Sequence, residues 1–301
     1  MVNSPSTEII KLTIIQKFFL YFSKLSILLL INISSLNAIN KSIADDYVHE
    51  GINAFYNYEF DKSLKILDSA RILFPEHPGV HFIWASSKYY YSQAQFPTLT
   101  TYDTLESCLN QIEPIYYNLI KTNPSEPLYN LYLGSLKGLR ARASLGKKRW
   151  LRLLSTSYQG FRIINDVYRD NPNIIDAQLP IGIVEYYSSL SNPILKIALS
   201  FYGINSSKEN SLKKIHLAAD SSEWAWIEAS GILSFLYLWI ENRPDKANKY
   251  SKLLVDKFPA NFYFSVMYLE SLIRIGEIEK AKDLILELTN SISNLTNRQR
   301  K

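Results

Sequence analysis

Few side chains in this sequence are suited to catalysis or to binding a metal. The 301 residues include one cysteine, Cys108, and four histidines, His49, His77, His81 and His216. A single cysteine cannot form an internal disulfide or a thiolate cage, and a Pro-Gly pair between His77 and His81 disfavours a shared helical face. The sequence contains no H-E-x-x-H, G-x-S-x-G or phosphate-binding glycine loop. It therefore predicts a protein that is not an enzyme and that uses no metal or cofactor.

A basic stretch in the middle of the chain could bind an anionic partner. Positions 127–165 contain no Asp or Glu, although the whole chain carries a formal charge of only +5. Two explanations stay open. Cations near a helix C-terminus are favourable by ~0.3–1 kcal/mol, and a basic patch attracts anionic lipid, glycan or an acidic protein. Nucleic acid is not expected, because no matching motif accompanies the charge. The residues of this predicted basic patch are Arg140, Arg142, Lys147, Lys148, Arg149 and Arg152.

Residues 44–78 contain the pattern on which the rest of the chain is built. Apolar and aromatic residues recur at helical spacing from Tyr47 to Tyr58 and again from Leu64 to Leu73. Pro75 ends the second of these stretches, because proline cannot continue a helix. The pattern predicts two helices folded back on each other.

This unit resembles a tetratricopeptide repeat, a helix–turn–helix unit of 34 residues. The alternative is an ordinary helical hairpin within a bundle. At the glycine position of the repeat, a neighbouring helix can approach closely. The positions that carry the resemblance are Tyr47, Gly51, Phe60, Ser63, Leu67, Ala70 and Pro75.

Five further helix pairs are predicted after the first, with longer helices or loops in the middle of the array. They comprise residues 79–93 with 104–121, 127–145 with 150–169, 174–189 with 208–220, 223–241 with 245–258, and 262–275 with 277–290. No linker rich in Pro or Gly divides the array. The sequence therefore predicts an all-α, right-handed superhelical solenoid of about six antiparallel pairs over residues 39–292, followed by a polar tail at 293–301.

Solenoids of this kind bind partners on a concave surface lined by the first helix of each pair. By analogy with the repeat, the lining positions fall one, four and five residues after the position of Gly51. In this chain they are mainly aromatic or apolar, which suits an apolar or aromatic-rich segment. The alternative is that the superhelix closes and these rings pack on one another. The predicted groove residues are Phe55, Tyr56, Tyr89, Tyr90, Tyr186, Tyr187 and Trp239.

A second unusual stretch is SNPILKIALSFYGINSS, residues 191–207. It is almost wholly apolar from Ile194 to Tyr202, although it connects two predicted helices, where a solvated loop would be polar. The sequence favours a short helix that plugs the groove. It leaves open a segment that contacts a membrane or a partner.

The middle of the chain also resembles a narrower group, exported bacterial tetratricopeptide proteins of unassigned function. The similar segments are KKRW (147–150), residues 160–166, DAQLPIGIVEYYSSL (176–190) and SSKENSLKKIHLAADSSEWAWIEA (206–229). The group is distantly similar to a eukaryotic mitochondrial outer-membrane family associated with inclusion-body clearance. The resemblance implies a non-enzymatic helical scaffold. The chain departs from the pattern at Pro180, which would remove a backbone hydrogen bond near a helix start.

The N-terminus resembles an export signal. Lys11, Lys17 and Lys24 precede the apolar run LSILLLINISSLNA at 25–38, which is shorter than the ~20 residues of a membrane-spanning helix. Residues 1–38 are therefore predicted to be a signal peptide cleaved after Ala38, and the alternative is an uncleaved membrane anchor. Either one places the folded part outside the cytoplasm, in the periplasm or cell envelope.

Together these features predict a non-enzymatic protein-interaction scaffold of the periplasm or cell envelope. It would bind a protein partner through the aromatic groove, the basic patch or both. The alternative is a solenoid that binds a small ligand, a glycan or a lipid, between Tyr and Trp rings. An open, continuous groove would favour the scaffold, and a closed pocket of several hundred Å3 would favour the ligand-binding protein.

Overall fold

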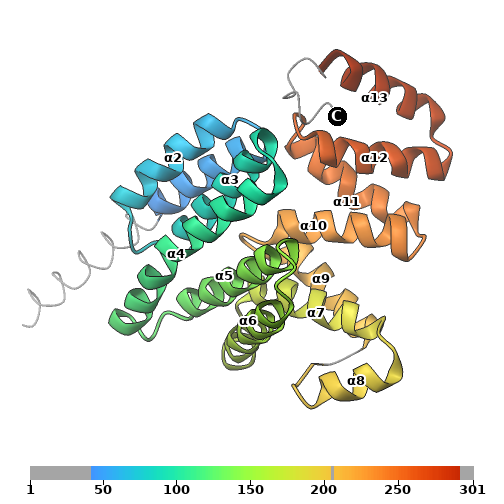
Figure 1. Cartoon of the computed structure of the whole chain (residues 1–301). Coiled ribbons are helices and arrows are strands. Elements are labelled where there is room, and N and C mark those ends of the chain that lie inside the picture. The colour runs from blue at the N-terminus through green and yellow to red at the C-terminus, as the bar shows by residue number, and fades with distance from the viewer. Residues whose placement is uncertain (1–41, 205–206, 292–301) are drawn as a thin grey trace, which may run out of the picture. The chain divides into compact units, whose positions relative to one another are not determined.

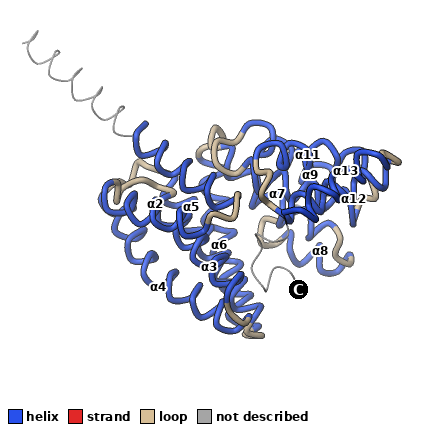
Figure 2. Tube along the Cα trace, turned by 90° about the horizontal axis from the view of Figure 1, so that it is seen from above, coloured by secondary structure: helices blue, strands red, loops and turns tan. Residues whose placement is uncertain are grey.

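The computed structural model of the chain describes residues 42–204 and 207–291. The predicted signal peptide (1–38) and polar tail (293–301) lie outside the described residues. The chain divides after Tyr47 into two units, and the second contains the helical array. In the described part of that unit the regular elements are all helices (Figure 2). None of the described helices is both long enough and apolar enough to cross a bilayer.

Consecutive helices form pairs along the chain (Figure 1). The first pair is the helix over 42–56 with α2 (Phe60–Leu73). The others are α3 (Val80–Gln95) with α4 (Thr98–Thr122), α5 (Pro127–Gly146) with α6 (Trp150–Asp170), α7 (Gln178–Ser189) with α9 (Lys208–Ser221), α10 (Trp226–Phe235) with α11 (Pro244–Lys257), and α12 (Phe262–Ile275) with α13 (Ile278–Ser291). Helices pack mainly on the helices before and after them in sequence. This arrangement is an α-solenoid and confirms the predicted fold class.

Three short elements interrupt this regularity. A 3-10 turn, Ile175–Ala177, precedes α7. The helix α8 (Pro193–Ser200) lies between α7 and α9. The π-helical segment η2 (Leu236–Ile240) continues α10. The irregular spacing seen in the sequence thus comes from these elements in the fourth and fifth pairs and from the long helices α4, α5 and α6, which have 25, 20 and 21 residues.

The second helices of four pairs end in the same backbone conformation. The residue after α2, α4, α6 and α11 has φ between −129° and −136° and ψ between 59° and 69°. A proline follows each of these residues and disfavours helical backbone in the residue before it. The pairs are Phe74-Pro75, Asn123-Pro124, Asn171-Pro172 and Phe258-Pro259. The prolines in the sequence therefore set the repeated turn.

Glycine allows the two helices of a pair to approach closely. A Cβ atom on Gly182 of α7 would lie 2.8 Å from Cγ1 of Ile215 and 3.0 Å from the backbone oxygen of Ser211, both on α9. A Cβ atom on Gly51 would lie 2.7 Å from the side chain of Leu67. Both contacts are shorter than ordinary van der Waals separations. The role predicted for the glycine position of the repeat is therefore confirmed.

The start of α4 differs from what the sequence suggests, and Pro180 costs less than the sequence suggests. α4 begins at Thr98 rather than at 104, which shortens the expected loop over 95–100 to Phe96 and Pro97. Thr101 in the added turn is buried and its hydroxyl bonds to the backbone oxygen of Ser92 on α3 at 3.4 Å. Tertiary contact thus extends the helix into a polar stretch. Pro180 lies in the first turn of α7, where a missing N–H costs no helical hydrogen bond.

The first pair touches the last pair within this unit. Asn261 caps α12 by accepting a hydrogen bond from the Phe264 N–H at 3.1 Å. Its Nδ2 donates to the backbone oxygen of Tyr56 at 2.8 Å, and its Oδ1 accepts from the Tyr58 hydroxyl at 3.2 Å. These partners lie 205 and 203 positions apart in the chain. The helix cap of α12 therefore also joins the two ends of the array.

Candidate functional site

Four of the seven predicted groove residues line one cavity. Phe55 and Tyr56 come from the first helix, Tyr90 from α3 and Tyr187 from α7. The cavity measures about 670 Å3 and is completed by α10 and α12. We call it the aromatic cavity, because further rings line it. They belong to Tyr58, Phe60, Phe235, Tyr263 and Phe264.

The other three predicted groove residues do not line the aromatic cavity. Tyr89 and Tyr186 are 1% and 0% exposed and belong to the core, so their predicted groove position is wrong. They lie one residue before Tyr90 and Tyr187, and one residue rotates a side chain by about 100° around the helix. Trp239 is partly exposed in the π-helical segment, which shifts the helical phase.

No sequence signal points to the half of the cavity that the turns and the last pairs supply. Tyr58 lies in the turn after the first helix, Glu228 on α10 and Tyr263 in the first turn of α12. No spacing in the sequence links these three residues. They meet because Asn261 joins the ends of the array, which is a tertiary event.

Glu228 is the acidic group of the aromatic cavity. Its carboxylate accepts a hydrogen bond from the Tyr56 hydroxyl. Burial raises the pKa of Tyr56 well above its usual value, and the charge of Glu228 raises it further. The same two causes raise the pKa values of Tyr90 and Tyr263. Within residues 42–204 and 207–291, Glu228 belongs to no ion pair. The cavity therefore combines protonated phenols with a carboxylate that lacks a cationic partner there.

Arg142 alone among the six residues of the predicted basic patch lines the aromatic cavity. Its Nε donates to the Tyr89 hydroxyl at 3.1 Å, and its guanidinium carbon lies 5.8 Å from the centre of that ring. Burial by itself would lower the pKa of Arg142, but the hydrogen bond to Tyr89 outweighs it and the pKa is raised. Tyr89 thus serves the cavity indirectly, by holding a cation at its edge.

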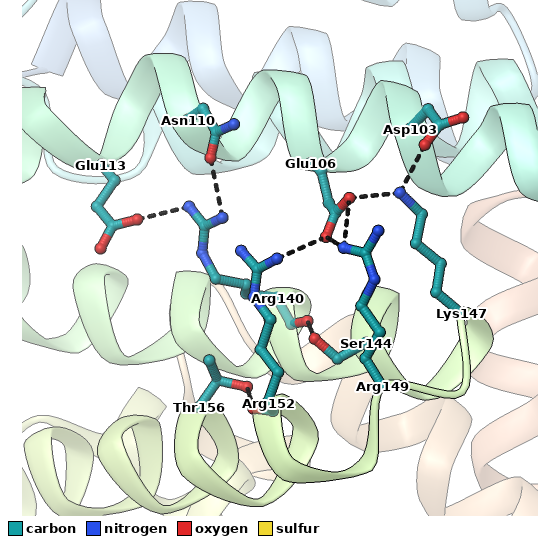
Figure 3. A network of polar contacts seen from close by, with 10 residues as sticks. All are labelled: Asp103, Glu106, Asn110, Glu113, Arg140, Ser144, Lys147, Arg149, Arg152 and Thr156. Carbon is teal, nitrogen blue, oxygen red and sulfur yellow. Dashed lines mark hydrogen bonds and ion pairs between the residues drawn. The ribbon is translucent and has the colours of Figure 1, made fainter.

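Other cations of the predicted basic patch are paired with carboxylates of α4 (Figure 3). Lys147 donates to Asp103 at 2.5 Å and also to Glu106. Arg149 and Arg152 reach the same Glu106 at 3.1 and 3.3 Å. We call this group, together with the pairs described next, the α4–α6 network. Its carboxylates come from the preceding helix, so the acid-free stretch 127–165 does not reveal them.

The second half of the α4–α6 network centres on Glu113. Arg140 donates to this carboxylate at 2.5 Å and to the side-chain oxygen of Asn110 at 2.9 Å. Lys137 donates to the same carboxylate, and all three charged side chains are at most 18% exposed. Lys148 is exposed at the turn with a φ of 57°. Most of the predicted basic patch is thus internally paired rather than free.

The pairing shifts the pKa of both central carboxylates. Burial by itself would raise the pKa of Glu106, but the hydrogen bond and charge of Lys147 outweigh it and the pKa is lowered. The pKa of Glu113 is lowered in the same way, by Lys137 and Arg140 against burial. Both carboxylates are therefore charged at neutral pH, and the network is held by charge-assisted hydrogen bonds.

Three of the four histidines lie close together, because His49 and His77 both contact the ring of Trp224 and His77 is near enough to His81 to contribute to lowering its pKa. His49 stacks on Trp224 with ring centroids 4.2 Å apart. His81 is buried, accepts from Nε of Arg71 at 3.1 Å and donates from Nε2 to a backbone oxygen, and burial lowers its pKa to about 4. His216 lies between the hydroxyls of two tyrosines. In the part of the chain that the structure describes, no three His, Cys, Asp or Glu side chains form a group that could hold a metal ion.

The apolar stretch 191–207 does not plug the aromatic cavity. It forms α8 (Pro193–Ser200), and none of its described residues lines the cavity. Ile194 and Phe201 are 81% and 84% exposed, whereas Ile204 packs into the core. The expected plug is therefore wrong. The alternative, a segment that contacts a membrane or a partner, stays a prediction.

Comparisons with known proteins find a similar solved structure. No protein-family model matches the sequence, and no curated protein matches it. The chain is similar to the crystal structure of a thermophilic TPR protein from Thermus thermophilus, with 15% sequence identity and a TM-score of 0.45. The match covers 76% of this chain and 99% of that protein. The resemblance to exported bacterial proteins and to the mitochondrial family stays a prediction.

Proposed function

We propose that this protein is a non-enzymatic interaction scaffold and that the aromatic cavity binds a segment of a protein partner. The observation that supports this most is the cavity itself, about 670 Å3 in volume and lined by rings from the first, second, fourth, fifth and sixth pairs. Tyr and Phe rings that border water are effective anchors for apolar side chains. The proposed partner segment is therefore rich in apolar or aromatic residues.

The charge of the cavity narrows the proposed segment further. Glu228 lines the cavity and accepts a hydrogen bond from Tyr56. A carboxylate surrounded by aromatic rings is a favourable place for an ammonium or guanidinium group, which the ring faces also attract. We therefore propose that the partner segment carries a Lys or Arg next to its apolar anchor.

The aromatic cavity is a better candidate than the predicted basic patch. Lys147, Arg149 and Arg152 share carboxylates with one another, so an acidic partner would have to compete with Glu106 for them. The proposed location, the periplasm or cell envelope, rests on residues 1–38 alone.

A second candidate function is the binding of a small ligand, a glycan or a lipid. The observation that favours it is the contact of Tyr56 and Tyr58 with Asn261. This contact joins the two ends of the array beside the cavity, as the wall of a closed pocket would. A volume of about 670 Å3 also lies within the usual range for small-molecule sites.

Two glycines allow the cavity to be tested with matched variants. A Cβ atom on Gly231, which lines the cavity, would meet only Phe264 at 3.8 Å, and one on Gly138 of α5 would meet nothing within 4 Å. Gly231→Leu therefore fills the cavity, while Gly138→Leu adds the same side chain to open space. Neither substitution forces a backbone clash.

The experiment is a selection of displayed random peptides on the full-length protein, followed by calorimetry. We expect selected peptides to combine aromatic and basic residues. Gly231→Leu should weaken their binding at least tenfold and Gly138→Leu should not. Equal binding by both variants would rule out the cavity. A failed selection together with a lipid or glycan that co-purifies with wild type but not with Gly231→Leu would establish the second candidate.

A further inference from the structure

Away from the aromatic cavity, α6 carries an apolar stripe on its outer face. Trp150, Leu154 and Tyr158 follow one another at intervals of four, and Leu151 lies beside them. All four are exposed, Leu151 by 85%. The outer face of a solvated helix is normally polar. A row of large exposed apolar side chains instead marks a surface that contacts something else.

A second apolar stripe lies on α8. Ile194, Ile197 and Phe201 are spaced by three and four residues, and all three are exposed. Figure 1 shows α8, drawn in yellow, projecting from the stacked pairs. Leu199 and Ile204 pack into the core beneath, beside Phe161 of α6. The helix is thus anchored on one side and presents its other side to solvent.

The two stripes meet at a pair of tyrosines. The rings of Tyr158 on α6 and Tyr202 after α8 lie edge to face with centroids 5.1 Å apart. Tyr158 ends the stripe that begins at Trp150, and Tyr202 follows the stripe that begins at Ile194. We call the two stripes together the α6–α8 surface. None of its residues lines the aromatic cavity, so it is a separate site.

The charges around the α6–α8 surface are mainly positive. Residues 127–165 and 186–208 contain no Asp or Glu. Arg162 follows the stripe of α6 and is exposed, and Lys196 lies within α8. The next acidic residues on α6, Asp166 and Asp170, share the single cation Arg169, which leaves an excess of one negative charge at the far end of this helix. Beside the two stripes themselves the charged residues are the cations Arg162 and Lys196.

The charged residues beside the start of the apolar stripe on α6 also carry a net positive charge. Lys147, Arg149 and Arg152 face the two carboxylates of Asp103 and Glu106. Three cations against two anions leave an excess of one positive charge. The pairing fixes these side chains without neutralising the border of the surface.

We propose that the α6–α8 surface docks on an anionic lipid bilayer. Trp and Tyr among Leu, Ile and Phe are the residues that enter the headgroup region of a membrane. Cations around such a set bind lipid phosphates and add electrostatic attraction. A protein partner with an apolar surface would not require the basic border, so charge favours lipid. The protein lies on the bilayer in this proposal, with the aromatic cavity free to bind.

The experiment uses a polarity-sensitive dye on the full-length chain. Cys108 is buried, so a nitrobenzoxadiazole dye attaches selectively to a new exposed cysteine. Ile194→Cys places the dye on the α6–α8 surface. Ile72→Cys is the matched control, because Ile72 on α2 is also 81% exposed and lies outside the surface. Both labelled chains are mixed with phosphatidylcholine vesicles, with or without phosphatidylglycerol.

We expect the emission at position 194 to shift to the blue with phosphatidylglycerol vesicles, less so at high salt, and that at position 72 to stay unchanged. Adding Leu154→Ser and Phe201→Ser to the chain labelled at position 194 should weaken vesicle binding at least tenfold. Equal responses at the two positions would overturn the proposal. So would recruitment to neutral vesicles without a selective shift, which an N-terminal anchor would produce. A shift at 194 without vesicles, with dimers in sedimentation, would assign the surface to self-association.

Discussion

The aromatic cavity and the α4–α6 network both contain carboxylates, but Glu106 and Glu113 of the network are largely buried whereas Glu228 of the cavity is exposed, and their pairing differs. In the network, Glu106 and Glu113 are each held by at least two cations of the same chain. In the cavity, Glu228 has a hydrogen bond from Tyr56 and no ion-pair partner among the described residues. Charge that is balanced inside the chain contributes to folding. A carboxylate that lines a cavity without an ion pair is available for a partner, and the Arg142 guanidinium at the edge of the same cavity is available in the same way.

The largest expected effect comes from removing a carboxylate of the network. Glu113→Ala leaves Lys137 and Arg140 without their carboxylate partner, and their side chains are only 11% and 7% exposed. A buried ion pair that loses one member destabilises a protein by about 3 kcal/mol or more. Urea denaturation should show this loss of unfolding free energy. If Glu113→Ala unfolds like wild type, the network is not structural.

A control replaces the whole group instead of one member. Glu113→Leu combined with Lys137→Met and Arg140→Met removes every charge and keeps the volume. We expect this triple variant to recover most of the stability, because no charge is left buried alone. A triple variant as unstable as Glu113→Ala would mean that packing, and not charge, is responsible.

The second prediction concerns the stability of the protein at acidic pH. The folded pKa values of Glu106 and Glu113 lie below the ordinary value of 4.5, so the network adds stability above about pH 4.5 and loses it as the pH falls through the lowered values. The melting temperature of Glu106→Gln/Glu113→Gln should therefore fall less steeply below pH 4.5 than that of wild type. His81, with a pKa of about 4, destabilises both proteins equally between pH 6.5 and 4. Parallel curves would contradict the prediction.

The third and smallest effect compares two glycines in helices. Gly231→Ala at the cavity wall meets only Phe264 at 3.8 Å, and alanine should stabilise the helix by about 1 kcal/mol. Gly182→Ala should instead destabilise by overpacking, since its Cβ would lie 2.8 Å from Ile215. Urea denaturation of both variants tests this. A higher free energy of unfolding in both variants would mean that α7 and α9 can move apart at little cost.

The sequence predicted the helix pairs well, because local chemistry determines them. Prolines such as Pro75 and Pro259 end helices through their own backbone, and Gly182 marks by its residue type alone a position at which another helix can approach closely. The start of α4 was missed, because Thr101 is helical owing to a contact with α3. Local signals therefore give the array, and neighbouring helices adjust its ends.

The candidate site was predicted only in part. Tyr56, Tyr90 and Tyr187 follow from the repeat, but the phase at Tyr89 and Tyr186 was wrong by one residue. Glu228 and Asn261 could not be found, since they reach the cavity only when the ends of the array meet. The basic patch looked free because its carboxylate partners lie on α4, outside the acid-free window.

The proposed difference between the two carboxylates, binding at Glu228 and folding at Glu106, is tested most directly by neutralising each of them in turn. Glu228→Gln keeps a hydrogen-bond acceptor for Tyr56, whereas Glu106→Gln removes the negative charge that pairs with Lys147. The melting temperature and the affinity for a selected peptide are measured for both variants. We predict that Glu228→Gln melts like wild type and binds the peptide at least tenfold more weakly, and that Glu106→Gln melts lower and binds normally. Normal binding by Glu228→Gln, or lost binding by Glu106→Gln, would contradict the account.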